Sequence, residues 1–546
     1  MDIALCLSGG GYRAAVYHIG VLLYLDSIKT EDGNSLLDYV NILSSVSGGS
    51  LTALWYVTNK AEGATNRDSF LKLYKSIVEN DIERHLYEDF KVGAKNGNTL
   101  IVQLASVYDK IFFQGKKYNI VLSAINREDF NIHHFAVCAT DFNNGRPFHF
   151  YASRPILVNE KYIDKLKIGN SDSLIDHSIA GEMSIADIMA ASSCFPGLFE
   201  PIVFPNDFKF DNPTMVEAIT KESFTLMDGG IVDNQGIEAI VKLDGLYKKN
   251  DSSIDFIIVS DVAKASPQKF DRSKVNVFSE DESFMSSIKN NIPWYISKYK
   301  YIRVCSLFSA IATIFGAIVT DGMFRLFFTF ASSILLMVFT IYTLFIRIVP
   351  RYYNMIVDNI KEKFAHKLSF DLDEQFVKEL KTNSILDFFK NRINSLMLMV
   401  NDVMMGQIRK HKLRQAFGGK TETRTIVNAI YALTSSGTWK QLKKKLEIEN
   451  EMRPNNIIMK NSDEVANIGT RLCFSGEQIN NDIPKKLVAC GQYTTCWNLL
   501  IWIKRNKGQA SNDDGNETQH LLIQMEKQLK NDWEQFKINP FYKSII

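Results

Sequence analysis

Residues 3–13 read IALCLSGGGYR and residues 40–49 read VNILSSVSGG. Each stretch begins with a run typical of a buried strand, ends in glycines and leads into a helix-like run. Gly9, Gly10 and Gly11 lie where a helix begins, so their backbone N–H groups can bind an anion. The second stretch has the shape of a nucleophile elbow, a sharp turn that exposes the hydroxyl of Ser47. Together they predict a serine that attacks an acyl group beside a loop that stabilises the oxyanion.

The same alternation of strand and helix continues along the first half of the chain. Further strand-like runs lie at Phe135–Ala139 and Ile254–Ser260, and helix-like runs lie at Ala14–Leu25, Leu51–Val57 and Ile185–Ala191. Strands that alternate with helices are typical of a parallel sheet covered on both faces. The sequence therefore predicts an α/β fold with a mainly parallel central sheet.

The composition disfavours several classes of protein. Of the 546 residues, 46% are hydrophobic and 23% are charged, so the chain can bury a large core and disorder is not expected. The net charge of +2 gives no reason to expect nucleic acid as a partner. The seven cysteines are scattered without paired metal-ligand spacing, which predicts no metal and fits a reducing compartment. No cofactor is expected. The N-terminus enters a strand without the basic region of a secretory signal.

A serine nucleophile needs a base, and the strongest candidate is a carboxylate. Residues 225–230 read TLMDGG, which places Asp228 at the end of a short apolar strand and before two glycines. That position can present Asp228 at the carboxyl edge of the sheet, beside the elbow. Because an unperturbed Asp has a pKa of about 3.9, the site would have to raise this pKa by partial desolvation. None of the histidines after Ser47 stands in a comparable frame of small residues.

Two features of the glycine run have competing interpretations. A nucleotide phosphate loop is disfavoured, since neither G-x-x-x-x-G-K-[ST] nor G-x-G-x-x-G with an acidic strand end downstream is present. Arg13 lies in the first helical turn and is predicted to orient the loop or to meet a lipid phosphate. A plain salt bridge is the alternative role for this arginine.

A membrane signal lies in the middle of the chain. Val304–Val319 and Leu326–Val349 are apolar, and the polar segment Thr320–Arg325 separates them. A helix needs roughly 20 residues to cross the bilayer core, so the second run is long enough and the first is marginal. The alternative is an apolar helical pair inside a soluble core, where such long apolar runs are rare.

Basic residues flank this pair of apolar runs on both sides. They are Lys298, Lys300 and Arg303 before the pair, and Arg347 and Arg351 after it. If both runs span the bilayer, both flanks face the same side, and the positive-inside rule places that side in the cytoplasm. We therefore expect a multi-pass membrane protein with a two-helix hairpin and a cytoplasmic catalytic part.

Changes in composition divide the chain into five predicted segments. They are a catalytic core at 1–265, a polar linker at 266–300, a transmembrane hairpin at 301–350, a helical part at 351–500 that completes or caps the catalytic domain, and a polar segment with a terminal helix at 501–546. Within the fourth segment, the methionine-rich run Ile385–Ile408 is expected to be a helix that packs on the core or lies on the membrane.

Several of these stretches occur in the order and spacing of patatin-like phospholipases. The three main ones are Ser8–Ala14, Ser45–Gly49 and Asp228–Gly230. Ser8 stands where patatins usually carry Asp, so the first stretch resembles the cytosolic phospholipase A2 branch more closely. Residues 139–147, with ATD and GRP, and residues 190–197, which begin AASS and end PG, also fit. The resemblance covers residues 1–265 well and 354–500 loosely, and Ser45 departs from the first glycine of G-x-S-x-G.

The resemblance implies a three-layer patatin-like α/β fold, interrupted here by the hairpin, and a serine–aspartate dyad without histidine. Ser47 would be the nucleophile, Asp228 the base, and Gly9, Gly10 and Gly11 the oxyanion hole. The implied substrates are ester-linked acyl chains of membrane phospholipids or lysophospholipids, so the expected partners are these lipids and the bilayer.

Three alternatives remain open at this point. One is a serine esterase with a Ser-Asp-His triad, which would use His366 or His411. Another is a membrane-tethered binding or regulatory protein with a degenerate hydrolase core. The third is a nucleotide-responsive effector in which a ligand or oligomerisation switches lipolysis on.

Overall fold

The computed structural model of this chain describes residues 2–93, 99–158, 161–163, 166–211, 223–250, 252–263, 284–365, 391–396, 398–417, 424–441, 450–506 and 524–544. Contacts divide the chain into two compact units. The first combines Met1–Gln268 with Met399–Ile546, and the second is Lys269–Leu398. The part of the chain after residue 398 therefore folds together with the N-terminal part.

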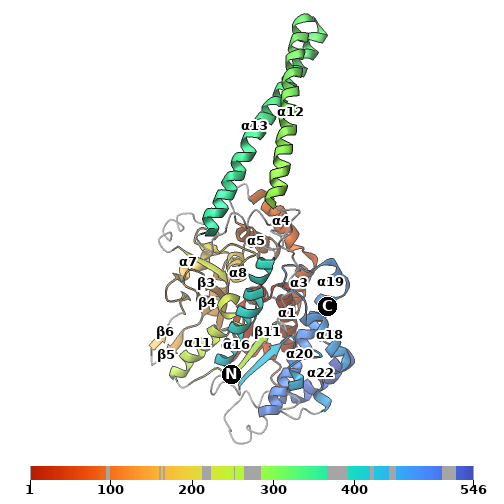
Figure 1. Ribbon diagram of the computed structural model, residues 1–546. Coiled ribbons are helices and arrows are strands. Elements are labelled where there is room, and N and C mark those ends of the chain that lie inside the picture. Colours follow the sequence, from red (N-terminus) through yellow and green to blue (C-terminus); the bar gives the residue numbers. More distant parts are fainter. Residues whose placement is uncertain are drawn as a thin grey trace. The chain divides into compact units, whose positions relative to one another are not determined.

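A mainly parallel sheet forms the centre of the first unit and confirms the predicted α/β fold (Figure 1). Five parallel strands lie in the order β12 (Thr425–Ala429), β11 (Phe256–Asp261), β1 (Ile3–Leu7), β2 (Val40–Val46) and β3 (His134–Asp141). The sheet continues antiparallel through β4 (Arg146–Ser153), β7 (Ile168–Gly169) and β8 (Leu174–Ile175), while β10 (Phe224–Asp228) pairs with β3 and with β9 (Ile202–Phe204). A separate pair is formed by β5 (Ile156–Val158) and β6 (Lys161–Ile163).

Strand β1 shows how the sheet divides the core into two layers. Side chains of a strand alternate between the two faces, so an entirely apolar strand needs cover on both sides. Ile3, Leu5 and Leu7 belong to one apolar cluster, whereas Ala4 and Cys6 belong to another. The first cluster contains residues of α1 (Gly11–Ser27), α2 (Gly48–Ala61), α8 (Ile185–Ser193), α20 (Ile483–Asn506) and α22 (Glu526–Ile538), and the second contains residues of α11 (Ile237–Tyr247) and α16 (Met405–Ala416). The fold is thus three-layered, with helices on both faces.

The other described helices of the first unit surround these layers. They are α3 (Asn66–Glu79), α4 (Ile82–Gly93), α5 (Leu100–Tyr108), α6 (Asn119–Ile125), α7 (His177–Glu182), α10 (Gly230–Asp233), α18 (Asn456–Ala466) and α19 (Gly476–Asn480). A π-helical turn at Met399–Met404 leads directly into α16.

Helices α1 and α20 cross at a very short distance. A Cβ on Gly20 would lie 2.1 Å from the carbonyl oxygen of Val488, and a Cβ on Gly491 would lie 2.3 Å from that of Tyr17. Only glycine allows two backbones to approach so closely. Together with β12, this contact ties the segment after residue 398 to the N-terminal sheet.

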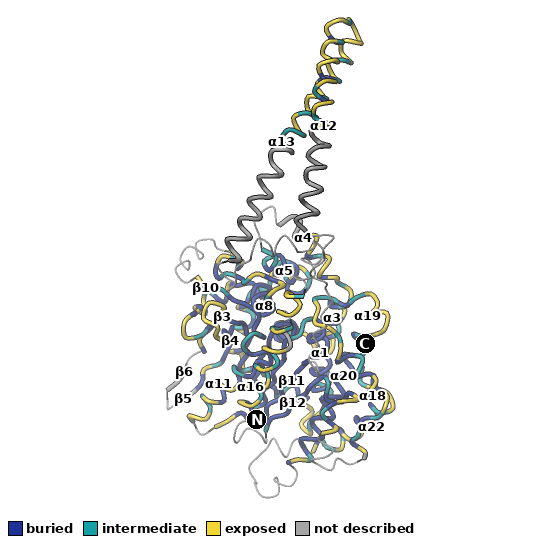
Figure 2. The backbone as a smooth tube through the Cα atoms, viewed as in Figure 1, coloured by how far each residue is buried: buried dark blue, intermediate teal, exposed yellow. Residues whose placement is uncertain are grey.

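The second unit contains two long helices, α12 (Phe284–Val319) and α13 (Met323–Ala365). The windows Tyr301–Val319 and Met323–Leu344 have mean hydropathies of 2.0 and 1.9 and are long and apolar enough to cross a membrane. Only 17% and 6% of these windows is buried, and Figure 2 shows mainly exposed and intermediate residues along the described part of both. The helices contact each other at Gly316, where an added Cβ would lie 3.3 Å from the ring of Phe328.

Helix α12 begins at Phe284, inside the stretch 266–300 that the sequence predicts to be a linker. Residues 264–283 lie outside the described residues, as do 366–390, which include the first part of the predicted helix Ile385–Ile408. The rest of that run, apart from residue 397, is helical, with a π-helical turn at Met399–Met404. Within the terminal segment, residues 507–523 also lie outside the description, and α22 follows them.

Candidate active site

Ser47 lies at a sharp turn between β2 and α2, as the elbow motif predicts. Its φ of 50° and ψ of −124° lie in a region that side chains other than glycine rarely adopt. Such a conformation costs on the order of 1–3 kcal/mol and persists only where surrounding contacts enforce it. The two residues after it must be small, because a Cβ on Gly48 would lie 2.1 Å from the carbonyl oxygen of Gly11 and one on Gly49 would lie 2.4 Å from that of Leu7.

The glycine loop follows β1 and begins α1, also as predicted. Gly10 and Gly11 have φ values of 148° and 61°, which favour glycine. A Cβ on Gly11 would also lie 2.4 Å from the carbonyl oxygen of Arg471. In the described part of the chain, neither Gly10 nor Gly11 donates its N–H to a protein acceptor. These two amides remain available to an oxyanion.

The third glycine corrects the sequence prediction. The Gly9 N–H donates to the backbone carbonyl of Asn234 at 3.0 Å, so this amide is already engaged. The Asn234 side chain fills the space beside it, since a Cβ on Gly9 would lie 2.5 Å from Asn234 Oδ1. The structure therefore leaves Gly10 and Gly11 as the loop's donors and gives Gly9 a packing role.

Strand β3 brings Ser47 and Asp228 together. Val46, the last residue of β2, pairs with Cys138 of β3, so Ser47 lies level with the next residue, Ala139. Strand β10 runs antiparallel to β3 and its last residue, Asp228, pairs with Ala139. The ends of β2 and β10 therefore meet beside the same residue of β3. Ser47 and Asp228 are about 180 residues apart in the sequence, but β3 brings the ends of their two strands together.

Burial makes Asp228 a stronger base than an ordinary aspartate. The residue is 3% exposed, and this desolvation raises the pKa of its carboxyl to about 6. Two polar groups act in the opposite direction by stabilising the charged form: the Gly230 N–H, which donates to Asp228 Oδ1 at 2.7 Å, and the Ser47 hydroxyl. Neither partner is a histidine. A carboxyl with a pKa near 6 beside a serine hydroxyl is suited to general-base catalysis at neutral pH.

Arg13 is only 4% exposed and is bonded to backbone carbonyls. It donates from Nη1 to Ile468 and from Nη2 to Val262, both at 2.6 Å. Burial lowers the pKa of Arg13 to about 10; the charge of Arg409 also lowers it, and Asp261 raises it. This geometry supports the predicted loop-orienting role, and such burial leaves little access to a lipid phosphate.

The two histidines proposed for a triad have different outcomes. His411 is an exposed residue on α16, and His366 lies outside the described residues.

A third histidine, His18, is fully buried and binds the carbonyl oxygen of Ser8 at 2.9 Å and Ser260 Oγ at 3.0 Å. Burial lowers the pKa of His18 to about 4. This neutral imidazole therefore stabilises the start of the glycine loop, at Ser8.

Sequence reasoning gave no role to two residues that contact the site. Asn234 lies between the glycine loop and the end of β10, because a Cβ on Gly230 would lie 2.7 Å from Asn234 Oδ1. Ser192 accepts the N–H of Ser47 at 2.9 Å. Ser192 stands in the quoted AASS stretch, but nothing local in the sequence indicates that its partner lies 145 residues away.

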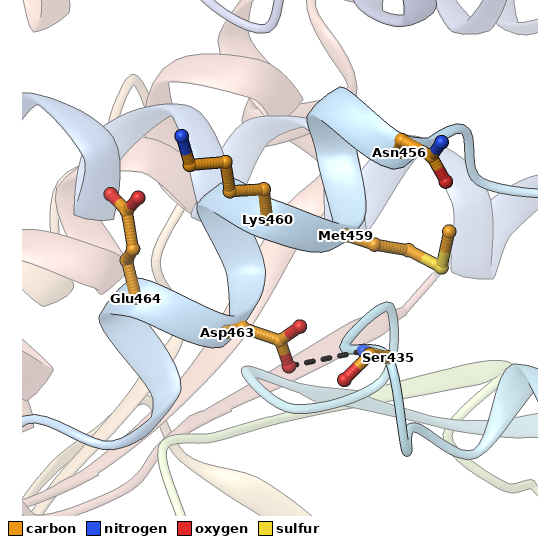
Figure 3. A pocket seen from close by; sticks show the side chains of 6 residues that line it. All are labelled: Ser435, Asn456, Met459, Lys460, Asp463 and Glu464. Carbon is orange, nitrogen blue, oxygen red and sulfur yellow. Dashed lines mark hydrogen bonds between the residues drawn. The ribbon is translucent and has the colours of Figure 1, made fainter.

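A surface hollow of about 550 Å³ lies elsewhere, along α18 (Figure 3). It is lined by Ser435, Asn456, Met459, Lys460, Asp463 and Glu464. Asp463 accepts the Ser435 N–H at 3.0 Å, and Glu464 is paired with Lys486, so both carboxylates of the hollow already have protein partners. Among the described residues, no group of three or more His, Cys, Asp or Glu side chains is arranged to hold a metal ion.

One family model matches the first part of the chain. Residues 5–241 match the family model described as patatin-like phospholipase. They include both Ser47 and Asp228, and the match supports a lipid acyl hydrolase in general terms. No match was found among curated protein sequences.

Solved structures give more distant similarities. The human GIVD cytosolic phospholipase A2 is 13% identical, with a TM-score of 0.32 over 49% of this chain and 43% of that one. The same human protein in complex with methyl gamma-linolenyl fluorophosphonate is 15% identical, with a TM-score of 0.25 over 35% and 29%. VipD from Legionella pneumophila is 11% identical, with a TM-score of 0.25 over 99% and 90%. The chain thus covers less than half of the human phospholipase.

Proposed function

We propose, from the patatin-like phospholipase domain that residues 5–241 form, that this chain is a membrane-associated serine lipid acyl hydrolase of the phospholipase A or lysophospholipase type. The proposal rests mainly on one observation: Ser47, on a strained turn, lies beside the buried carboxyl of Asp228. A serine nucleophile beside a base with a raised pKa is an arrangement suited to acyl transfer.

In the proposed reaction, the Asp228 carboxylate accepts the hydroxyl proton of Ser47 as Oγ attacks the ester carbonyl carbon. The oxyanion that forms is stabilised by the N–H groups of Gly10 and Gly11 at the beginning of α1. When the tetrahedral intermediate collapses, Asp228 returns the proton to the departing alcohol oxygen and leaves an acyl-serine. Water then attacks this ester and gives its proton to Asp228. When the second tetrahedral intermediate collapses, Asp228 returns that proton to Ser47 Oγ and the fatty acid leaves.

The proposed membrane association rests on the second unit. A large exposed apolar surface on a protein is stable when it contacts another apolar phase. Ile311, Phe315, Phe327 and Phe330 are each more than half exposed, and the windows that contain them are long enough to span a bilayer. We propose that α12 and α13 cross the membrane as a hairpin with the catalytic unit on the cytoplasmic side. Membrane phospholipids or lysophospholipids would then be the substrates.

The direct test is hydrolysis of phospholipid and lysophospholipid vesicles by the purified full chain in detergent. Ser47→Ala and Asp228→Asn should each lose nearly all turnover, whereas the surface variants Ser435→Ala and Asp129→Asn should retain it. Undiminished turnover in either of the first two variants would refute the dyad.

A fluorophosphonate probe separates the enzyme from a tethered binding protein with a degenerate core. The probe should label wild type at Ser47 and fail to label Ser47→Ala. Absence of labelling in the folded wild type would favour the binding protein. Loss of turnover in His411→Ala would instead favour a histidine triad.

A further inference from the structure

The side chain of Ser192 lies at the C-terminal end of α8 and links the elbow to strand β3. Its Oγ accepts the Ser47 N–H at 2.9 Å and donates to the carbonyl oxygen of Cys138, on β3, at 2.7 Å. Ser50 Oγ, in the first turn of α2, lies 2.9 Å from the same atom. Ser192 is fully buried, so water cannot replace these bonds without opening the core.

These contacts fix the strained turn from one side, while α2 fixes it from the other. The carbonyl oxygen of Ser47 accepts the N–H groups of Ser50 at 2.7 Å and Leu51 at 3.3 Å, which fixes the peptide after Ser47. The N–H of the peptide before Ser47 donates a hydrogen bond to Ser192 Oγ. Because φ is the rotation between that peptide and the Cα of Ser47, the bond to Ser192 opposes relaxation of the φ of 50°.

The same short segment also holds the strand that carries the base. The Asp228 N–H donates to the carbonyl oxygen of Cys194 at 2.9 Å, and the Gly229 N–H donates to that of Ser192 at 3.4 Å. Ser192 and Cys194 therefore contact the backbone on both sides of the dyad. A shift of this segment would change the distance between Ser47 and Asp228, whereas a shift of α2 alone would move only one of them.

We infer that Ser192 is a positioning residue, whose hydroxyl holds the Ser47 turn in its reactive conformation and in register with Asp228. This inference rests on the proposed dyad. The role needs one group that accepts an N–H and donates an O–H within the same small volume, which a hydroxyl supplies and a methyl group does not. Ser193 provides a matched comparison, because its Oγ donates to Met189 on its own helix at 2.9 Å and contacts Tyr108 at 3.4 Å.

The test uses the full chain in detergent, with Ser192→Ala compared against Ser193→Ala. Misplacement of reacting groups by a fraction of an ångström to 1 Å costs about 10- to 100-fold in rate, so we expect Ser192→Ala to lower both kcat and the fluorophosphonate labelling rate by ~10- to 100-fold. KM should change less than about two-fold, because Ser192 is fully buried and its hydroxyl is bonded to protein groups. Ser193→Ala should keep the wild-type labelling rate.

A pH profile distinguishes positioning from a general loss of stability. The Ser47 hydroxyl lowers the pKa of Asp228, so a displaced Ser47 should move the midpoint of the labelling-rate profile to higher pH in Ser192→Ala. A merely structural serine would change the amount of folded protein without moving this midpoint. Ser192→Thr keeps the hydroxyl and should restore most of the rate.

Labelling of folded Ser192→Ala at the wild-type rate, with an unmoved midpoint, would overturn the inference. If Ser192→Ala yields no folded protein, Ser192→Cys takes its place, because the thiol keeps the volume and bonds more weakly. Wild-type labelling by folded Ser192→Cys would then overturn it. Failure of the proposed function looks different, since Ser47→Ala would then be as active as wild type in vesicle hydrolysis.

Discussion

The two units of this molecule distribute polar and apolar residues in opposite ways. In the first unit, the groups that form the candidate site are polar and buried: Asp228, Ser192 and Arg13 are at most 4% exposed, and each is bonded to backbone. In the second unit, large apolar side chains such as Phe315 and Phe330 are about 70% exposed. Buried polar groups and exposed apolar groups both cost free energy, so each departure from the usual pattern marks a place where function is expected.

The largest expected effect on turnover comes from a substitution that places a side chain in the glycine loop. Gly11→Ala combines a left-handed φ of 61° with a Cβ 2.4 Å from the Arg471 carbonyl oxygen, so the loop must shift from its position against Arg471. We expect a loss of turnover of about 100- to 1,000-fold, the range found when an oxyanion-hole donor is removed. The measurement is kcat on phospholipid vesicles.

Gly33→Ala is the matched control for this substitution. Gly33 has a φ of 84° but no atom within 4 Å of an added Cβ, so it tests backbone strain without a clash. It should cost about 1 kcal/mol of stability and leave turnover unchanged. Equal effects of the two variants on turnover would mean that close packing around the loop is unimportant for the site.

The second effect concerns the exposed apolar surface of the hairpin. Ile334 lies in the middle of the window Met323–Leu344 and is 48% exposed. An aspartate at the centre of a spanning helix costs about 2.5–3.5 kcal/mol of insertion free energy, so Ile334→Asp should reduce the membrane-bound fraction. The measurement is resistance of the bound protein to carbonate extraction.

Ile538→Asp is the corresponding control in the first unit. Ile538 is 72% exposed at the end of α22, so an aspartate there meets solvent. Its membrane-bound fraction should equal that of wild type. If Ile334→Asp also extracts like wild type, the proposal that α13 spans the membrane is wrong.

How far sequence predicts this molecule depends on whether a feature is local. The elbow at Ser47 and the glycines at 10 and 11 follow from neighbouring residues, because turn geometry needs small residues at adjacent positions. The engagement of Gly9 by Asn234 does not, because it depends on where the chain returns 225 residues later. The same holds for β12, which completes the parallel sheet from residues beyond the hairpin.

The site residues divide in the same way. Asp228 could be found from a strand that ends in Asp-Gly-Gly, whereas its pKa depends on burial that no local pattern shows. Ser192 sits in a stretch that resembles a family motif, but its role needs the register of β2, β3 and α8 in three dimensions. Sequence thus indicates which groups carry the chemistry, and tertiary contacts decide how those groups are held.

The third effect is a pH dependence of stability produced by Asp228. Its pKa is about 6 when folded and about 3.9 when unfolded, so the folded state binds more protons between these values. Stability should therefore fall as pH rises from about 4 to about 6 and stay lower above, by up to about 3 kcal/mol. Asp228→Asn removes this ionisation, so its Tm should exceed that of wild type at pH 7.5 and approach it near pH 4.

The same group should give turnover the opposite pH dependence. The proposed base must be deprotonated, so kcat of wild type should rise through a midpoint near pH 6 while the Tm declines. Asp129→Asn, whose side chain is 75% exposed, should follow wild type in both measurements. A Tm difference between wild type and Asp228→Asn that does not vary with pH would contradict burial of an ionisable Asp228.

The smallest effect tests whether a buried charge outside the proposed dyad still supports the site. Arg13 connects the carbonyl oxygens of Val262 and Ile468 through two nitrogens, and its Nη2 lies 3.7 Å from where a Cβ on Gly10 would stand. Lysine keeps the charge but has a single nitrogen, so Arg13→Lys should lose one of these bonds at a cost of about 1–2 kcal/mol. Because Val262 and Ile468 come from separate parts of the chain, we expect a lower Tm together with a loss of turnover of less than about ten-fold.

Arg84→Lys is the control. Arg84 is an exposed arginine paired with Glu88, so this variant should change neither quantity. A lower Tm with unchanged turnover would show that Arg13 stabilises the fold without orienting the loop, and then buried polar groups of the first unit would mark function only where they touch Ser47 or Asp228.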